Sequence, residues 1–227
     1  MDERFSRSSR ILGQERLEKL NNSSVIVFGV GGVGGAVLEA LVRGGVGTVG
    51  VVDKDIINIT NLNRQIIATD ANIGEKKVDA AQKRALSINP KVNIEKYDLF
   101  YLPETAEQID LAKYDFIVDA VDNVTAKLEL IGRAEKLGIP IISSMGTGNK
   151  LHPEMFEITD IYKTSVCPLA RVIRRELKNR GIKNLTVVYS KEEPVKTDSS
   201  VPGSTSFTPP VAGYLMASYI IRKLTEV

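Results

Sequence analysis

The stretch Val25-Ile26-Val27-Phe28-Gly29-Val30-Gly31-Gly32-Val33-Gly34 decides the fold. Its four leading apolar residues run straight into glycines, as a buried parallel strand entering a tight turn does. Apolar residues from Val37 to Val42 then recur at helical spacing until Gly44. A second apolar run, Val49 to Val52, ends in Asp53. Strand, glycine turn, helix and strand together predict one βαβ unit.

The glycines of this turn fit the spacing G-x-G-x-x-G between a strand and a helix. The first glycine allows the tight turn, the second lets the backbone approach a phosphate, and the third packs helix against strand. The helix N-terminus adds unpaired N–H groups that favour an anion. Asp53 ends the next strand, where a carboxylate accepts a ribose hydroxyl. The motif therefore predicts a nucleotide site rather than a purely structural turn, without identifying the nucleotide.

The rest of the chain continues the alternation of strands and helices. Helices are expected over Gly13–Leu20, Glu75–Ile88, Lys127–Leu137, after Pro168 and over Val211–Leu224, and strands over Val92–Tyr97, Phe116–Ala120, Ile139–Ser143, Met155–Thr159 and Leu185–Tyr189. This order predicts a Rossmann-like α/β fold, with a mostly parallel sheet, helices on both faces and antiparallel additions in the second half. We expect a single domain over residues 1–227, with an N-terminal arm and helix at 1–22 and a mobile loop at 191–210.

Composition excludes several classes of protein. The 227 residues are 43% hydrophobic and 26% charged, with a formal net charge of +2. A globally basic nucleic-acid coat and a highly charged disordered chain are thereby excluded, whereas a local basic face is allowed. The single cysteine, Cys167, and the single histidine, His152, cannot form a disulfide within the chain, a four-cysteine zinc site or a histidine-rich metal centre. We interpret His152 as an ordinary loop residue and Cys167 as non-catalytic.

Targeting signals are not expected. Residues 1–10 are charged and precede no apolar run, so they do not resemble a secretory signal. No stretch reaches the ~18 to 20 apolar residues of a membrane span. The expected location is the reducing cytoplasm.

The segment that follows the aspartate of the second strand is crowded with hydrogen-bond donors, unlike that of a dehydrogenase. Arg64 offers a planar fork to phosphate oxygens, and Lys76 or Lys77 offers a point charge. Taken alone, Asn61 and Asn63 indicate an ordinary turn, in which asparagine side chains hydrogen-bond to the nearby backbone. Beside the glycine loop, the pattern favours a polyphosphate.

A second acidic cluster follows the predicted strand at 116–120. Asp119, Asp122 and Asn123 lie at its carboxyl end, where open α/β sheets bind ligands. A carboxylate there suits Mg²⁺ bridging nucleotide phosphates, with Asp122 as the first candidate ligand and Asp119 as the second. Capping of a helix that starts near Thr125 is the structural alternative, and it is compatible with metal binding.

Together these motifs resemble the ubiquitin-activating-enzyme-like (ThiF/MoeB-type) adenylating family, which includes the activators of molybdopterin and thiamin synthesis. The resemblance rests on the glycine loop, Asp53 with Asp55, Thr60–Gln65 (TNLNRQ), Gly74–Lys77, Ile88–Pro90 and Asp119–Asn123. It implies that the chain binds ATP and Mg²⁺. The implied nucleotide-binding residues are Gly29, Gly31, Gly32, Gly34, Asp53, Asp55, Asn61, Asn63, Arg64, Gln65, Lys77, Asp122 and Asn123.

The resemblance also implies individual roles. Asp53 would hold the ribose, while Asn61, Arg64 and Lys77 would hold the triphosphate. Asp122 would organise Mg²⁺. An N-terminal arginine would reach the ATP of a partner subunit in a homodimer, and Arg10, or alternatively Arg7, matches it. The residues assigned to catalysis are therefore Arg64, Lys77, Asp122 and Arg10.

The second half of the sequence narrows the resemblance to one group within this family. Lys163–Arg171 and Gly203–Gly213 are similar to the tRNA threonylcarbamoyladenosine dehydratases, which use ATP to cyclise that nucleoside through adenylation of its carboxylate. The scarcity of cysteine separates the chain from zinc-bearing sulfur-carrier activators. Two alternatives remain, namely adenylation of the C-terminal glycine of a ubiquitin-like sulfur carrier and an NAD-binding regulatory module. Sulfur-relay proteins stay open as additional partners.

A basic helix is the candidate surface for tRNA. Apolar residues after Pro168 can face the core while cationic side chains project outward and neutralise phosphates. These cations are Arg171, Arg174, Arg175, Lys178, Arg180 and Lys183. The alternative is an ordinary solvated helix face with cations near its C-terminus.

Overall fold

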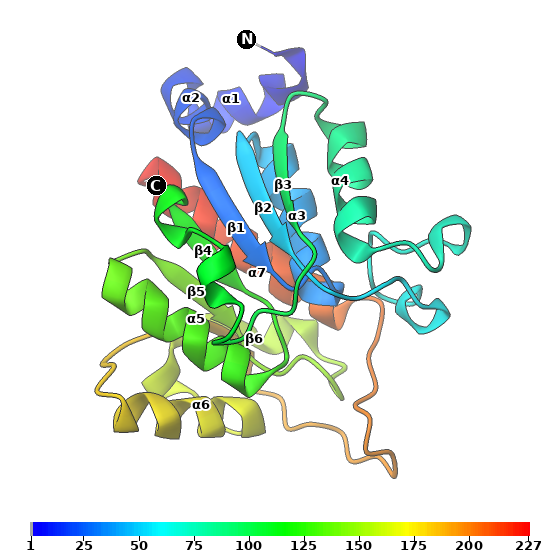
Figure 1. Cartoon of the computed structure of the whole chain (residues 1–227), viewed down its shortest axis with the longest axis vertical. Helices are drawn as coiled ribbons and strands as arrows, with labels where there is room; N and C mark the ends of the chain where they lie inside the picture. The colour runs from blue at the N-terminus through cyan, green and yellow to red at the C-terminus, as the bar shows by residue number, and fades with distance from the viewer. Residues whose placement is uncertain (1) are drawn as a thin grey trace.

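The sheet lies at the centre of the molecule. The computed structural model describes residues 2–227, and within them seven strands form one sheet in the order β3-β2-β1-β4-β5-β7-β6 (Figure 1). The strands are β1 (Ser24–Phe28), β2 (Thr48–Val52), β3 (Asn93–Tyr97), β4 (Phe116–Asp119), β5 (Ile141–Ser144), β6 (Phe156–Asp160) and β7 (Thr186–Ser190). All neighbouring pairs are parallel except β6 with β7. The predicted Rossmann-like, mostly parallel sheet with an antiparallel addition is confirmed.

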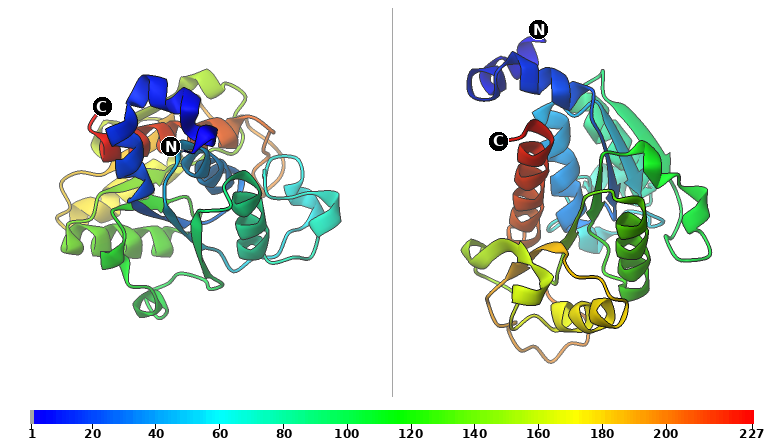
Figure 2. Two further views of the ribbon diagram at one scale, coloured as in Figure 1. Left: turned by 90° about the horizontal axis from the view of Figure 1, so that it is seen from above. Right: turned by 90° about the vertical axis from the view of Figure 1, so that its left-hand side faces the viewer.

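Helices cover both faces of this sheet. The α-helices of the described residues are α1 (Ser6–Leu12), α2 (Gln14–Asn21), α3 (Gly32–Gly44), α4 (Lys77–Ile88), α5 (Val124–Leu137), α6 (Pro168–Asn179) and α7 (Thr208–Thr225). Helices α3 and α7 pack together on one face, and α5 lies on the other (Figure 2). Helix α6 lies at the end of the molecule towards which β1 points (Figure 1).

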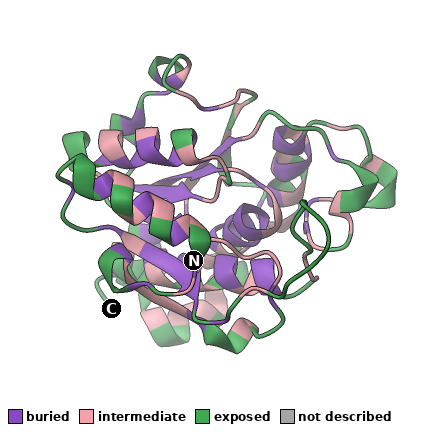
Figure 3. Ribbon diagram, turned by 90° about the horizontal axis from the view of Figure 1, so that it is seen from below, coloured by how far each residue is buried: buried purple, intermediate pink, exposed green. Residues whose placement is uncertain are grey.

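The alternating side chains of β1 explain the two layers. Val25 and Val27 join the core cluster beneath α3 and α7, whereas Ile26 and Phe28 join the cluster that contains Leu130 of α5. Because successive side chains of a strand point to opposite faces, an apolar run with no polar alternation requires cover on both. Figure 3 shows the strands buried between helices whose outer faces are exposed.

Helix α7 corrects two predicted boundaries. It begins at Thr208 rather than Val211, so the segment without helix or strand ends at Phe207 instead of residue 210. Its first turn contains Pro209 and Pro210, which a helix accepts there because the first N–H groups have no intrahelical partner. Gly213 then permits close contact with α3, since a Cβ there would lie 2.3 Å from the Val33 carbonyl oxygen.

The N-terminal helices lie at the amino ends of the strands, far from their carboxyl ends (Figure 1). Helix α2 is fixed to the end of α7 by a 2.5 Å ion pair between Lys19 and Glu226 and by a 3.2 Å hydrogen bond from Arg16 Nε to the Thr225 carbonyl. Arg10 is exposed on α1. Among residues 2–227, no helix combines the length and apolarity needed to cross a membrane.

Candidate functional site

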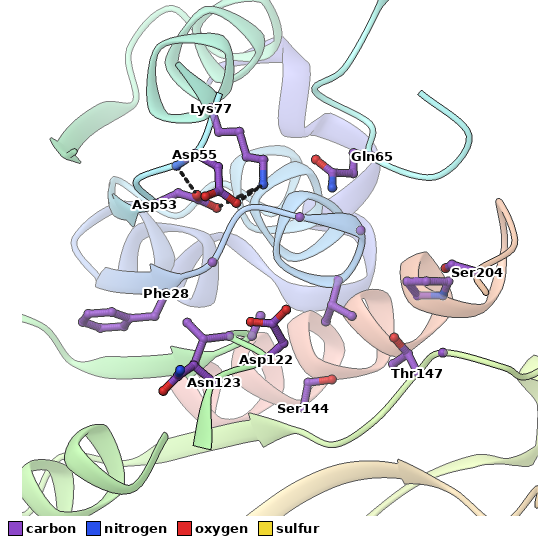
Figure 4. A pocket seen from close by; sticks show the side chains of 18 of the residues that line it. Phe28, Asp53, Asp55, Gln65, Lys77, Asp122, Asn123, Ser144, Thr147 and Ser204 are labelled. Carbon is purple, nitrogen blue, oxygen red and sulfur yellow. Dashed lines mark hydrogen bonds and ion pairs between the residues drawn. The ribbon is translucent and has the colours of Figure 1, made fainter. Parts of the chain in front are cut away.

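A cavity of about 830 Å³ opens at the carboxyl ends of β1, β2, β4 and β5. One wall carries Asp53, Asp55 and Lys77, a second carries Asp122 and Asn123, and Thr147 and Ser204 lie on a further side (Figure 4). The predicted residues that line the cavity are Gly29, Gly31, Gly32, Asp53, Asp55, Asn61, Arg64, Gln65, Lys77, Asp122 and Asn123. Parallel strands gather these residues because their carboxyl ends share one edge of the sheet.

The glycine turn is formed by close backbone contacts. Gly29 has φ +82°, in the left-handed region that favours glycine. A Cβ on Gly34 would lie 1.8 Å from the Gly29 carbonyl oxygen, so Gly34 packs helix α3 against the strand rather than lining the cavity. The Val30 N–H donates to Asp53 Oδ2 at 2.9 Å and ties the turn to the end of β2.

Asp53 and Lys77 form the charged centre of the first wall. Asp53 Oδ1 also accepts from the Asp55 N–H at 2.9 Å, and its Oδ2 lies 3.9 Å from Lys77 Nζ. Burial raises the pKa of Asp53 above its ordinary value, against the opposing effect of Lys77 and the backbone donors. Lys77 is 6% exposed and pairs with Asp55 at 2.8 Å. Lys76 instead pairs with Asp98, so Lys77 is the lysine that faces the cavity.

The TNLNRQ segment forms a tight turn beside the glycine loop. Asn61 Oδ1 accepts from the Asn58 N–H at 2.9 Å. Asn61 therefore stabilises the turn through its side chain, as expected, and it also lines the cavity. Arg64 also lines the cavity, whereas Asn63 lies outside the lining. Gln65 is 6% exposed and lines the cavity, but its Oε1 has no hydrogen-bond partner within residues 2–227. A buried polar atom without a partner costs stability unless a ligand or water supplies one.

On the second wall, the two predicted aspartates have different surroundings: Asp122 faces the cavity, whereas Asp119 is buried. Asp122 is exposed and lines the cavity, and Asn123 lines it while its Oδ1 caps α5 by accepting from the Ala126 N–H at 3.0 Å. This cap starts α5 at Val124, earlier than the predicted Lys127. Asp119 was wrong as a candidate metal ligand, because it is fully buried and paired.

The partner of Asp119 is Lys127, which is also fully buried. Lys127 Nζ donates to Asp119 Oδ2 at 3.0 Å and to the Ser144 carbonyl at 2.7 Å, and Ser143 Oγ donates to the same Asp119 oxygen. This network links α5 to the ends of β4 and β5 beneath the cavity. A buried charge requires such partners because removing it from water is costly.

Two parts of the lining were not identified from the sequence. The segment from Ser144, the last residue of β5, to Gly148 and the segment Val201–Ser204 line a further side of the cavity. Phe28, Val52 and Leu99 add an apolar patch. The signal for the first loop was its place after a buried strand, since serine, threonine and glycine follow β5 at the ligand-binding edge.

The basic helix α6 reaches the cavity through Leu169, which lines it. Arg171, Arg175, Lys178 and Arg180 on or just after this helix are exposed, as is Lys183 beyond it. Arg174 was wrongly predicted to project outward, because its Nη1 donates to the Thr164 carbonyl at 2.7 Å. His152 lies exposed in a loop, and Cys167 is 3% exposed.

The residues fit a nucleoside triphosphate. Glycine backbone, Arg64 and Lys77 supply donors and positive charge, and the unpaired Gln65 oxygen is left for a ligand or its bound water. No group of three or more acidic, histidine or cysteine side chains that could hold a metal occurs within the described residues 2–227. A Mg²⁺ ion here would therefore depend on Asp122 together with phosphate oxygens and water, which is its usual arrangement.

Comparisons with known proteins agree with this geometry. The model of the ThiF family matches residues 5–227. The chain is 40% identical to the tRNA threonylcarbamoyladenosine dehydratase of Bacillus subtilis, over 98% of this chain and 94% of that protein. Crystal structures of the Escherichia coli tRNA N6-threonylcarbamoyladenosine dehydratase with AMP and with ATP superpose with a TM-score of 0.93 at 31% identity, covering 98% of this chain and 94% of that one. A sulfur carrier protein adenylyltransferase of Thermus thermophilus is 42% identical over 58% of this chain and 48% of its own length.

The buried pair beneath the cavity yields a stability prediction. Lys127→Met should lower the free energy of unfolding by about 3–5 kcal/mol, because Asp119 then remains buried without its cation. The double variant Lys127→Met/Asp119→Leu should recover most of that loss, since it removes both charges. Urea denaturation measures both values. A single variant as stable as the wild-type protein would show that Lys127 does not compensate Asp119.

Proposed function

The chain belongs to the ThiF family, and on that premise we propose that it uses ATP to dehydrate threonylcarbamoyladenosine in tRNA. The observation that carries the proposal is the division of one cavity between a glycine turn with Asp53, Arg64 and Lys77, and a second side formed by Ser144–Gly148 and Val201–Ser204. The first side suits a nucleoside triphosphate. The second leaves room for the group that reacts with it.

The reaction activates a carboxylate, which is a poor electrophile. An oxygen of the threonyl carboxylate attacks the α-phosphorus of ATP, forms a new P–O bond and displaces pyrophosphate. A nucleophile of the same modified nucleoside then attacks the acyl carbon, loses its proton and expels AMP. The ring closes with the net loss of one water molecule. No protein nucleophile takes part, which agrees with a buried Cys167 and an exposed His152 in a loop.

The protein contributes alignment and charge. Arg64 and Lys77 stabilise charge that develops on the phosphates, and Asp53 with the glycine turn positions the ribose and phosphate chain. Asp122 would hold Mg²⁺, which would neutralise phosphate charge when bound. Asn61, Gln65 and the neighbouring amides complete the cradle. Asn63, which lies outside the cavity lining, has an indirect role.

The two alternative functions, activation of a sulfur carrier and NAD-binding regulation, receive less support. The sulfur carrier adenylyltransferase aligns with 131 residues, whereas the Bacillus subtilis dehydratase aligns with 98% of the chain. The single cysteine cannot form the four-cysteine zinc site expected of carrier activators. An NAD-binding regulator would not need the charged groups Arg64 and Lys77 that face the cavity. The proposed chemistry requires no sulfur, so sulfur-relay proteins would be accessory partners. We place the reaction in the cytoplasm.

Helix α6 supplies the proposed tRNA contact. Leu169, in the first turn of the helix, lines the cavity, and the exposed cations Arg171, Arg175 and Lys178 follow it along the helix. A phosphate backbone that follows this helix would place a nucleotide at the cavity mouth. Local binding of this kind is consistent with a net charge of +2.

A homodimer is proposed from the position of the N-terminal helix. Helix α1 lies at the amino ends of the strands, so Arg10 does not approach the cavity of its own chain (Figure 1). Ile11 beside it is 86% exposed, which suits a residue that packs against another subunit. In this arrangement Arg10 completes the nucleotide site of the partner.

The central test is mass spectrometry of nucleosides from tRNA incubated with the protein and Mg-ATP. Threonylcarbamoyladenosine should be converted into a product lighter by one water. Arg64→Ala should lower the turnover about 100-fold or more, because a phosphate-stabilising donor is lost. Circular dichroism controls for folding of the variant. An unchanged nucleoside peak with folded protein and correctly modified tRNA would exclude the dehydratase activity.

The tRNA surface is tested by salt dependence. The double variant Arg171→Ala/Arg175→Ala should weaken tRNA binding and reduce the slope of log affinity against log salt by about 1 per lost phosphate contact. ATP affinity should stay unchanged. Lys136→Ala, at an exposed position of α5, is the matched control and should leave the slope as it is. Equal slopes in the wild-type protein and the double variant would remove α6 from the interface.

The shared site is tested by complementation. Arg10→Ala and Arg64→Ala homodimers should each be inactive, whereas co-expression of the two chains should restore about a quarter of the wild-type turnover, because half of the dimers are mixed and each has one complete site. If Arg10 acted within its own chain, the mixed dimers would contain no complete site. Absence of recovery in verified mixed dimers would therefore contradict the assignment.

A further inference from the structure

The segment between β7 and α7, residues 191–207, crosses one side of the cavity, and we call it the strap. It contains no helix or strand. Val201–Ser204 line the cavity, while the side chains of Val195 to Val201 are exposed. Glu192 anchors the start of the strap, since it is 7% exposed and its carboxylate accepts from the Leu151 and His152 N–H groups. Residues 195–204 beyond it bury little apolar surface, so their order depends on a small set of hydrogen bonds. Segments held in this way open at low free-energy cost.

Asn149 provides the first attachment. Its side-chain Oδ1 accepts from the Gly203 N–H at 2.6 Å, and its own N–H donates to the Gly203 carbonyl at 2.8 Å. Its carbonyl also accepts from the Val195 N–H at 2.7 Å. Asn149 has φ 55°, a left-handed conformation that asparagine and glycine tolerate best. This attachment joins the strap to the loop after β5 and involves no residue of the nucleotide wall.

Asn63 provides the second attachment, and it connects the strap to the nucleotide wall. Its Nδ2 donates to the Ser204 carbonyl at 3.0 Å, and its Oδ1 accepts from Arg64 Nη1 at 2.8 Å. The same Nη1 donates to the Thr60 carbonyl at 2.9 Å. The carboxamide of Asn63 therefore bridges the guanidinium of Arg64 and the backbone of the strap.

The guanidinium keeps free donors on its other side. Both N–H groups of Nη1 are used by Thr60 and Asn63, whereas Nη2 and Nε of Arg64 have no acceptor among the described residues 2–227. An arginine side chain carries five N–H donors in a fixed fork. Phosphate oxygens can thus bind the free edge without breaking the hydrogen bond to Asn63.

We propose that Asn63 is a positioning residue that couples phosphate binding at Arg64 to the order of the strap. The proposal rests on the proposed function in that the cavity takes ATP. A phosphate that fixes Arg64 also fixes the Asn63 carboxamide, so less conformational entropy is lost when Ser204 is held. Coupling of this kind is reciprocal, and an ordered strap favours ATP to the same extent.

The coupling has a use in the proposed chemistry. Water hydrolyses an acyl adenylate. A wall that becomes ordered when ATP binds would exclude water from the cavity and so prevent this hydrolysis. Val201–Ser204 form that wall of the cavity, and Ser204 is the residue that Asn63 holds. The strap would therefore be in place before the carboxylate is activated.

Hydrogen–deuterium exchange of strap peptides, measured without tRNA, tests the coupling. In the wild-type protein, Mg-ATP should slow exchange at Gly203–Thr205 about fivefold or more. Adenosine should not, because it carries no phosphate for Arg64. Asn63→Ala should still bind ATP, since Asn63 does not line the cavity, but its strap should exchange equally with and without ATP. ATP protection of the wild-type size in this variant would overturn the proposal, as would its absence in the wild-type protein.

Asn149→Gly is the matched control. Glycine accepts the left-handed backbone at this position, so the substitution removes only the side-chain bond to Gly203. Its strap should exchange faster in both states while the ratio produced by ATP stays the same. If ATP no longer slowed exchange of the strap in Asn149→Gly but still did so in Asn63→Ala, Asn149 rather than Asn63 would carry the coupling, and the proposal would be overturned.

The dehydratase proposal is tested separately, because the exchange experiment needs only ATP. Strap protection that depends on Asn63, together with unmodified tRNA, would reject the dehydratase and retain the coupling. If the protein converted tRNA but ATP did not change the exchange of the strap, the dehydratase proposal would be retained and the coupling rejected. If equilibrium dialysis detected no ATP binding by the wild-type protein, both proposals would be rejected.

Discussion

The hydrogen bond from the Val30 N–H to Asp53 is the interaction on which the site depends. At 2.9 Å it joins the glycine turn to the end of β2, and so fixes the start of α3 relative to the sheet. Gly34 then packs against the Gly29 carbonyl, at a distance that excludes any side chain. The same carboxylate is drawn out of water, which raises its pKa. Asp53 therefore has two tasks, one in holding the turn and one in facing the cavity, and the first explains why a buried acid is placed there.

The sequence was sufficient for the first half of the molecule because local pattern and spacing determine it. Apolar runs of β1 and β2, the glycines between them and Asp53 follow one another within 30 residues, and no distant contact is needed to interpret them. The spacing alone does not distinguish Lys76 from Lys77, and only the family resemblance favours Lys77, since adjacent residues at a helix start differ only in the direction of their side chains. The contact of Lys76 with Asp98, 22 residues away, decided between them.

The remaining errors arose where a distant partner captures a side chain. Asp119 and Asp122 look equivalent in sequence, but Asp119 turns inward to Lys127 and Ser143, which belong to α5 and β5. Helical spacing placed Arg174 among exposed cations, whereas the Thr164 carbonyl attracts it inward. The wall formed by Ser144–Gly148 and Val201–Ser204 brings together segments about 50 residues apart and contains no charged side chain. The motif Gly203–Gly213 overlaps this wall, but nothing in its local pattern shows that it meets the loop after β5.

The burial of Cys167 has a practical consequence. It is the only cysteine of the sequence, and its side chain packs at the N-terminus of α6 with 3% of its surface exposed. Thiol reagents need the ionised, accessible sulfur, so they will react slowly with it while the fold is intact. A cysteine introduced on the surface would then carry a fluorophore or spin label at one defined position. The chain is thus suited to site-specific labelling in its folded state.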